Sequence, residues 1–82
     1  MDAHNLIVMA NRIGDFFAAQ PDRDEAMAGI ADHIRKFWAP GMRSEILAAV
    51  GTEAGAQLHE IVAAALVKHR VLLEPAAAKD GA

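Results

Sequence analysis

Residues 20–41 of this 82-residue chain read QPDRDEAMAGIADHIRKFWAPG, a stretch that contains both a start signal and a stop signal for one helix. Asp22 and Glu25 stand three positions apart, which is the pattern of a capping box. In that motif each side chain accepts a hydrogen bond from an amide that the start of the helix would otherwise leave unpaired. The Pro-Gly pair near the end of the stretch disfavours further helix. We therefore predict that a helix begins near Arg23 and that the Pro-Gly pair ends it.

Apolar residues in this helix recur at steps of three and four, which places them on one face. The predicted inward stripe consists of Ala26, Ile30, Ile34 and Phe37. A second strip consists of Met27, Ala31 and Trp38, and at about 100 degrees per residue it lies about 60 to 100 degrees from the first. A helix that is apolar on two sides is usually buried on two sides.

Three further segments have the helical period. One runs from about Asn5 to Ala19, with a stripe of Leu6, Met9, Ala10, Ile13 and Phe17. A short one carries Met42, Ile46, Ala49 and Val50, followed by Gly51, which we predict to adopt the left-handed conformation that closes a helix. The last runs from Glu53 to about Leu73, with Thr52 as a possible cap and a stripe of Leu58, Ile61, Val62, Ala65, Leu66, His69 and Leu72.

These segments predict an all-α fold, a small bundle of three to four helices. We assign residues 1–74 to a single helical domain, because the chain is short and has no internal repeat. Residues 75–82 offer nothing to bury, so we expect a disordered C-terminal tail there. Gly14 and Gly29 fall inside predicted helices, where glycine costs about 1 kcal/mol relative to alanine, and they indicate close approach of neighbouring helices.

Composition argues against several functions. The net charge of −3 and the interspersed signs disfavour nucleic-acid binding, which needs clustered lysine and arginine. Apolar runs are far shorter than the about 20 residues that a membrane span requires, so we expect no membrane association and a cytoplasmic protein. There is no cysteine, and His4, His33, His59 and His69 lack the spacing of a zinc helix. We predict no catalytic, cofactor-binding or metal-binding residues, and therefore no enzyme.

The only tryptophan, Trp38, lies close to the end of its predicted helix. Tryptophan is among the side chains that most often carry the binding energy of protein interfaces. Ala64, Val67 and Val71 add apolar side chains nearly opposite the main stripe of the last helix. A bundle of this length has too few elements to cover both faces, so we expect another protein to cover one. The alternatives are that Trp38 only plugs the end of the bundle, and that scattered surface valines and alanines are ordinary.

Two stretches carry a resemblance to a known family. MANRIGDFF at residues 9–17 and PDRDEAMAGIADHIRKFWAPGMR at residues 21–43, followed by a helical segment, resemble the delta subunit of soluble, NAD-dependent, molybdenum-containing formate dehydrogenases. The resemblance covers most of the chain. Its most specific part is the spacing of Gly29-Ile30-Ala31, His33, Phe37-Trp38, Pro40 and Met42-Arg43.

The resemblance implies a non-catalytic accessory subunit that supports the assembly, stability or molybdenum-cofactor loading of the catalytic subunit. Its implied partners are the catalytic alpha subunit and the electron-transfer subunits of formate dehydrogenase. Those subunits, and not this chain, are expected to carry molybdopterin guanine dinucleotide, iron–sulfur clusters and FMN. We predict that the residues in contact with the larger subunits are Met27, Ala31, Trp38, Pro40, Met42 and Arg43.

Two other functions stay open. The first is an autonomous helical homodimer, an interaction module unrelated to redox chemistry, whose apolar strips pair across a two-fold axis. The second is a nucleic-acid-associated helical module that uses Arg35, Lys36 and Arg43. The acidic balance of the chain ranks this second alternative last.

Overall fold

A computed structural model describes residues 2–75, and the predicted all-α fold is confirmed. In chain order the elements are α1 (Ala3–Phe17), α2 (Arg23–Phe37), α3 (Pro40–Ala49), the short 3-10 helix η1 (Ala54–Gln57), α4 (Glu60–Lys68) and α5 (Arg70–Leu73). The tail predicted for residues 75–82 lies outside the described residues except for Pro75, which is buried. The assignment of residues 1–74 to one domain stays a prediction.

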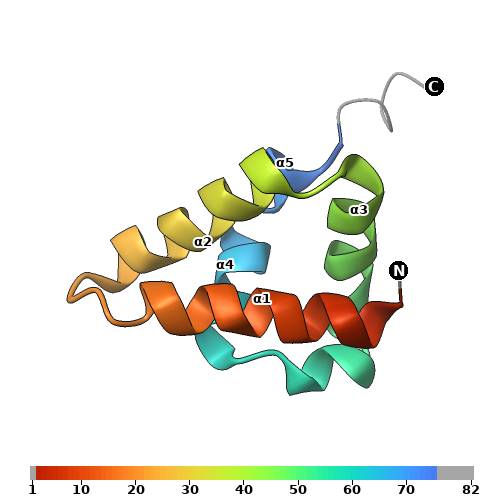
Figure 1. The fold of residues 1–82 in the computed structure, drawn as a ribbon, viewed down its shortest axis with the longest axis horizontal. Helices are drawn as coiled ribbons and strands as arrows, with labels where there is room; N and C mark the ends of the chain where they lie inside the picture. Colours follow the sequence, from red (N-terminus) through yellow and green to blue (C-terminus); the bar gives the residue numbers. More distant parts are fainter. Residues whose placement is uncertain (1, 76–82) are drawn as a thin grey trace.

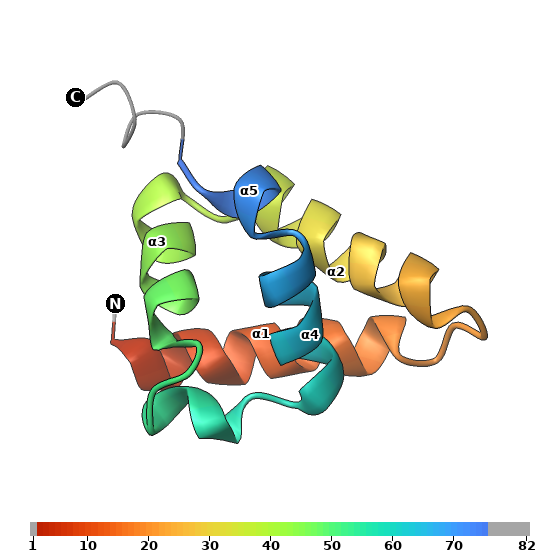
Figure 2. The ribbon, with the colours of Figure 1, turned by 180° about the vertical axis from the view of Figure 1, so that it is seen from behind.

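The first two helices form a hairpin whose arms spread apart from the connection at residues 18–22 (Figures 1 and 2). Helix α3 lies across the open end of this hairpin. Helix α4 lies behind the hairpin in the view of Figure 1 and packs on both of its arms. The short α5 packs beside α2, and η1 packs on α1. The later part of the chain therefore covers one side of the hairpin and leaves the other side open.

The core lies between the hairpin and the later helices, and each of α1 to α5 contributes to it. Its largest fully buried side chains are Leu6, Ile30, Ile34, Ile46, Val62, Leu66 and Leu73. Burying a side chain of this size contributes about 1.5–3 kcal/mol, so packing in this core is the main source of stability in a chain without cysteine.

Two glycines bring helices close together, as their positions inside predicted helices indicated. A Cβ atom at Gly14 would overlap the side chain of Val62 in α4. A Cβ atom at Gly29 would lie 2.6 Å from ring atoms of Phe17. Gly14 therefore permits the close contact of α1 with α4, and Gly29 permits the close contact of α1 with α2.

The start of α2 is the predicted one, but its end is not. Asp22 accepts a hydrogen bond from the amide of Glu25 at 3.1 Å, and the helix begins at Arg23. The helix ends at Phe37, and the residue before Pro40 is extended, as the residue before a proline tends to be. Pro40 then stands in the first turn of α3, where its missing amide proton costs nothing. The Pro-Gly pair therefore starts the next helix rather than ending this one.

This early end exchanges the expected positions of two adjacent aromatic side chains. Phe37 is 72% exposed and Trp38 is 6% exposed, so the prediction that Phe37 belongs to the inward stripe is wrong. Trp38 has left the helix with a ψ of 138°, and its side chain joins the core instead of continuing the helical step of about 100 degrees.

The single helix predicted from Glu53 to about Leu73 is also wrong, because the chain breaks twice in that region. Asn11 of α1 explains the first break. Its side-chain amide donates to the carbonyl of Gln57 at 3.0 Å, and its side-chain oxygen accepts from the amide of His59 at 2.8 Å. These bonds pair backbone groups that a continuous helix would have paired internally.

The second break occurs at His69, whose φ of −107° and ψ of 24° separate α4 from α5. The turn carries Leu73 into the core, where it is fully buried. His69 therefore marks a corner of the chain and not a position in a continuous apolar stripe. Its Nε2 atom is buried and has no hydrogen-bond partner within residues 2–75.

The turn after α3 follows the sequence prediction. Gly51 has a φ of +86°, the left-handed conformation expected of a residue that closes a helix. The Thr52 hydroxyl donates to the carbonyl of Ala49 at 2.6 Å and accepts from the amide of Gly55 at 3.3 Å, so it stabilises the turn between α3 and η1, whereas the N-cap of η1 is Glu53 and not Thr52.

Candidate functional site

Three of the six predicted partner-contact residues are buried inside the chain. Met27, Ala31 and Trp38 are 6%, 0% and 6% exposed, and all three belong to the core. The expectation that this strip is left open for a partner is therefore corrected, because α4 and α5 pack against α2 and cover it. The alternative in which Trp38 closes the bundle agrees with this burial.

The other three residues reach the surface to different degrees. Pro40 is exposed, whereas Met42 and Arg43 are half-buried. Arg43 donates from Nη1 to the carbonyl of Leu73 at 3.3 Å, so it joins α3 to the end of α5. A cation at the carbonyl end of a helix is favourable, which gives Arg43 a role within the fold. Contact of these residues with a partner stays a prediction.

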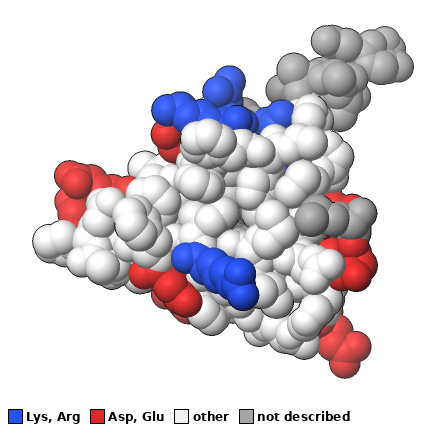
Figure 3. All heavy atoms as spheres, in the orientation of Figure 1, with Lys and Arg blue, Asp and Glu red and all other residues white. Residues whose placement is uncertain are grey.

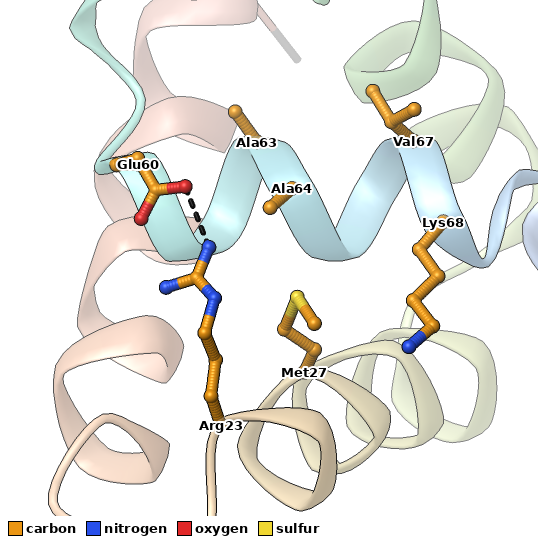
Figure 4. A pocket seen from close by; sticks show the side chains of 7 residues that line it. All are labelled: Arg23, Met27, Glu60, Ala63, Ala64, Val67 and Lys68. Atoms are coloured by element: carbon orange, nitrogen blue, oxygen red, sulfur yellow. Dashed lines mark hydrogen bonds and ion pairs between the residues drawn. The ribbon is translucent and has the colours of Figure 1, made fainter.

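A groove of about 490 Å³ lies between α2 and α4 (Figure 4). We call it the α2–α4 groove, and its lining residues are Arg23, Met27, Glu60, Ala63, Ala64, Val67 and Lys68. The alanines are small, so the side chain of Met27 rises from α2 toward Ala64 without filling the space between the helices. The floor of this groove is apolar and its rim is charged.

The charges on the rim of the α2–α4 groove are paired with each other. The guanidinium of Arg23 lies 2.6 Å from the carboxylate of Glu60, and the Lys68 ammonium lies 3.2 Å from the carboxylate of Asp24. The hydrogen bond from Arg23, with the attraction of its charge, holds the pKa of Glu60 below its ordinary value. The same hydrogen bond raises the pKa of Arg23. Both pairs link α2 to α4, so this chain supplies its own counter-charges here.

A row of aromatic side chains lies on the side of the hairpin that α4 leaves open. We call it the aromatic face, and its members are Phe16, Phe17, His33 and Phe37. The rings of Phe16 and Phe17 are 5.1 Å apart, edge to face, and those of His33 and Phe37 are 4.8 Å apart. Phe17 and His33 join the two pairs at 6.4 Å. Phe16 and Phe37 are 73% and 72% exposed, so the two ends of the row are open to solvent.

The aromatic face contains a shallow groove of about 340 Å³, lined by Arg12, Ile13, Phe16, Phe17 and His33. All five residues come from α1 and α2. Figure 3 shows the side of the molecule on which these two helices lie in front, and most of its surface is uncharged, with acidic side chains toward its edges. Among the described residues, Arg12 makes no ion pair.

The apolar side chains predicted on the outer side of the last helical segment are mostly exposed. Val67 in α4 and Val71 in α5 are 62% and 76% exposed, whereas Ala64 is half-buried. The prediction that the chain presents apolar surface at Val67 and Val71 is confirmed.

Within residues 2–75, no group of three or more potential metal-ligating side chains is placed to hold an ion. In the same part of the chain, no helix is both long enough and apolar enough to cross a bilayer. The described surface features are therefore the α2–α4 groove, whose rim charges are paired, and the aromatic face, where Arg12 has no ion pair among residues 2–75.

Comparison with known families places the chain in one of them. The sequence model of a family described as NADH-dependent formate dehydrogenase delta subunit FdsD matches residues 5–66. The chain belongs to this FdsD family. The family match runs from α1 into α4 and so includes every residue of the aromatic face. No curated protein and no solved structure matches the chain significantly.

Sequence reasoning about this FdsD chain missed the aromatic face, although one signal was present. Phe16 and Phe17 are adjacent, and adjacent residues of a helix point about 100 degrees apart, so both rings cannot lie in one stripe. The roles of Asn11 and Asp15 were not predicted either. The Asp15 carboxylate lies 2.9 Å from Nδ1 of His59, and together with Asn11 it holds the segment before α4 against α1.

Proposed function

We propose that this chain is a non-catalytic accessory subunit of an NAD-dependent formate dehydrogenase complex. It supports the assembly, the stability or the molybdenum-cofactor loading of the catalytic subunit. The observation that carries the proposal is the family match over residues 5–66. The molybdopterin guanine dinucleotide, the iron–sulfur clusters and the FMN belong, in this proposal, to the other subunits.

The surface of the chain supports a binding role. Phe16 and Phe37 are each more than 70% exposed, which places large apolar side chains in water at a free-energy cost that burial against a partner would remove. Residues 2–75 bring together no cluster of metal-ligating side chains. A subunit of this kind acts by what it binds.

The mechanism is thermodynamic linkage. A subunit that binds only the assembled state stabilises that state by about 2.7 kcal/mol when its free concentration is 100 times its dissociation constant. If it binds the catalytic subunit before the cofactor enters, the same free energy favours the conformation that accepts the cofactor. The first case stabilises a finished complex, and the second raises the fraction of complexes that contain molybdenum.

The two cases differ in the metal content of the complex. The formate dehydrogenase is produced with and without this chain, and molybdenum per catalytic subunit is measured by mass spectrometry beside formate oxidation. Loss of molybdenum that is not restored by adding the chain to the purified complex supports a role in loading. Unchanged molybdenum with a lower thermal midpoint, restored by adding the chain, supports a role in stability. Equal metal content, subunit composition and thermal midpoint in both preparations would contradict the proposal.

A homodimer is the second candidate, and the exposed Val67 and Val71 are the observation that favours it. Apolar side chains on neighbouring turns of α4 and α5 can pair with their copies across a two-fold axis. Sedimentation of the purified chain from nanomolar to micromolar concentration separates the two functions, because a free accessory subunit stays a monomer over this range.

A further inference from the structure

We infer that the aromatic face docks a segment of one of the larger subunits that presents an apolar side chain next to a carboxylate. The inference rests on the proposed function and adds to it a docking surface and the chemistry of the occupant. The apolar side chain occupies the groove beside Phe16 and Phe17, and the carboxylate pairs with Arg12. The juxtaposition that carries the inference is a row of aromatic rings, exposed at both ends, beside a cation that has no ion pair among residues 2–75.

The aromatic face is built before any partner arrives. The ring of Phe17 is seated on Gly29, where a side chain at position 29 would displace it. Phe17 is half-buried and packs on the core, so it anchors one end of the exposed Phe16 ring by an edge contact at 5.1 Å. On α2, the His33 ring lies 4.8 Å from the ring of Phe37, with the two planes tilted by 45°. A preformed surface loses less conformational entropy on binding than a mobile one.

The negative charge of the occupant is inferred from the acidic side chains near Arg12, which already have partners within the chain. Asp15 already makes a hydrogen-bond contact of 2.9 Å with the His59 ring, and Asp32 is paired with Lys36 at 3.1 Å. Arg12 lies in the wall of the groove without an ion pair among residues 2–75. A carboxylate brought by a partner would be partly shielded from water by the rings, which strengthens a hydrogen-bonded ion pair with a guanidinium.

The α2–α4 groove is a weaker candidate for the same partner. Arg23 is held by Glu60 and Lys68 is held by Asp24, so its rim offers equal numbers of paired charges of both signs. A charged partner would have to break these pairs before it gained new ones. At the aromatic face, a partner's carboxylate can bind Arg12 without first breaking an ion pair among the described residues.

A second copy of this chain does not fit the aromatic face well. Two-fold pairing would set the face against itself and offer Arg12 no free carboxylate, because Asp32 is already paired with Lys36 and Asp15 is hydrogen-bonded to His59. The two exposed phenylalanines, at 73% and 72%, supply much less than the about 800 Å² that a stable interface buries on each side. A larger subunit can surround this centre with further contacts.

The test measures binding of the full chain to formate dehydrogenase purified without it. The double variant F16S/F37S is expected to weaken the dissociation constant by about tenfold or more, as removal of central aromatic anchors does. The matched control is V67S/V71S, which removes two comparably exposed apolar side chains elsewhere on the chain and is expected to change the dissociation constant less than about twofold. Circular dichroism before and after heating verifies that both variants fold.

The charge of the occupant is tested by R12E and R12Q in the same binding assay. We expect R12E to bind more weakly than R12Q, and we expect the difference to shrink as salt is raised, because salt screens exposed charges. If F16S/F37S fails to fold, the two Arg12 variants still test the docking surface, because Arg12 is exposed and outside the core.

Each other outcome overturns a defined part of the inference. If V67S/V71S weakens binding and F16S/F37S does not, the docking surface is on α4 and α5. If R12E binds like the native chain, the occupant brings no carboxylate to Arg12. A dimer of the free chain that F16S/F37S dissolves assigns the aromatic face to a second copy. If the native chain does not bind the complex at all, the proposed function fails before the choice of surface arises.

Discussion

The two sides of the α1–α2 hairpin differ in how completely contacts within the chain cover apolar side chains and pair charged ones. On the side that α4 covers, Gly14 meets Val62, and the rim of the α2–α4 groove pairs each cation with an acid of the same chain. On the open side, aromatic rings stay exposed and Arg12 has no ion pair among the described residues. Apolar surface occurs on both sides, so it does not by itself distinguish them. An apolar surface beside a charged side chain that has no ion pair among the described residues is the better candidate for a docking site.

Two adjacent residues show the same contrast at the end of α2. Phe37 is the last residue of the helix and projects outward, and Trp38 turns inward as the first residue after it. Both are large aromatic side chains in the same segment of sequence. Their different exposure comes from the backbone, because the helix ends between them.

The largest effect is expected when the inner member of this pair is removed. Trp38→Ala should lower the free energy of unfolding by about 3–5 kcal/mol, because it leaves a cavity in the core. Phe37→Ala, the matched variant, should change it by less than about 0.5 kcal/mol, since its ring is mostly in water. Urea unfolding followed by circular dichroism measures both. Equal losses would show that the two sides of the hairpin are packed alike and would remove the contrast.

A smaller loss of stability is expected when a methyl group is added at either of the two glycines that lie in helix–helix contacts. Gly14→Ala should destabilise the chain by about 1–3 kcal/mol, because the new methyl group meets the fully buried Val62. Gly29→Ala should cost less than about 1 kcal/mol, because the half-buried Phe17 ring can turn toward solvent and alanine favours the helix.

Gly41→Ala serves as the control for these two substitutions. A Cβ at position 41 meets no atom within 4 Å, so this variant should be as stable as the native chain or more stable. Thermal unfolding of the three variants in one buffer gives their order. If Gly29→Ala were the most damaging, the aromatic face would be as tightly packed as the core.

The smallest effect is expected at the rim of the α2–α4 groove. Arg23 lowers the pKa of Glu60 in the folded chain, so the ion pair stabilises the fold above the ordinary glutamate pKa of 4.5 and this stabilisation is lost as the pH falls through the folded value. Glu60→Gln should therefore be slightly less stable than the native chain near pH 7, and the difference should disappear in acid. Because both side chains are more than half exposed, the difference should also shrink at high salt.

The check on this last prediction is thermal unfolding from pH 7 to pH 3 at low and at high salt. Lys36→Gln breaks an ion pair within α2 and leaves the α2–α4 link intact, so it provides a comparison in which the groove itself is unchanged. A difference between Glu60→Gln and the native chain that grew in acid would reverse the sign derived from the lowered pKa of Glu60.

Much of the fold was readable from local patterns. The cap at Asp22, the start of α2 at Arg23 and the left-handed Gly51 each depend on a few neighbouring residues, and each was found at the predicted place. Gly14 and Gly29 likewise indicated close helix contacts before their partners were known. The family was also readable, because its match depends on the order of residues along the chain.

The candidate site was less predictable, and the reason lies in contacts between distant residues. The burial of Met27 and Ala31 requires α4 and α5 to pack on α2, and periodicity within α2 cannot report what covers its second side. The break before α4 requires Asn11, which is 46 residues away from Gln57. The aromatic face requires the side chains of α1 and α2 to meet across the hairpin.

Short-range spacing and residue order are therefore enough to predict that this protein is helical, where its capped helix begins and to which family it belongs. The burial of Trp38, the exposure of Phe37 and the pairing of charges become visible only when the helices are packed together. Those outcomes depend on how the backbone leaves a helix and on side chains that meet only after the helices pack.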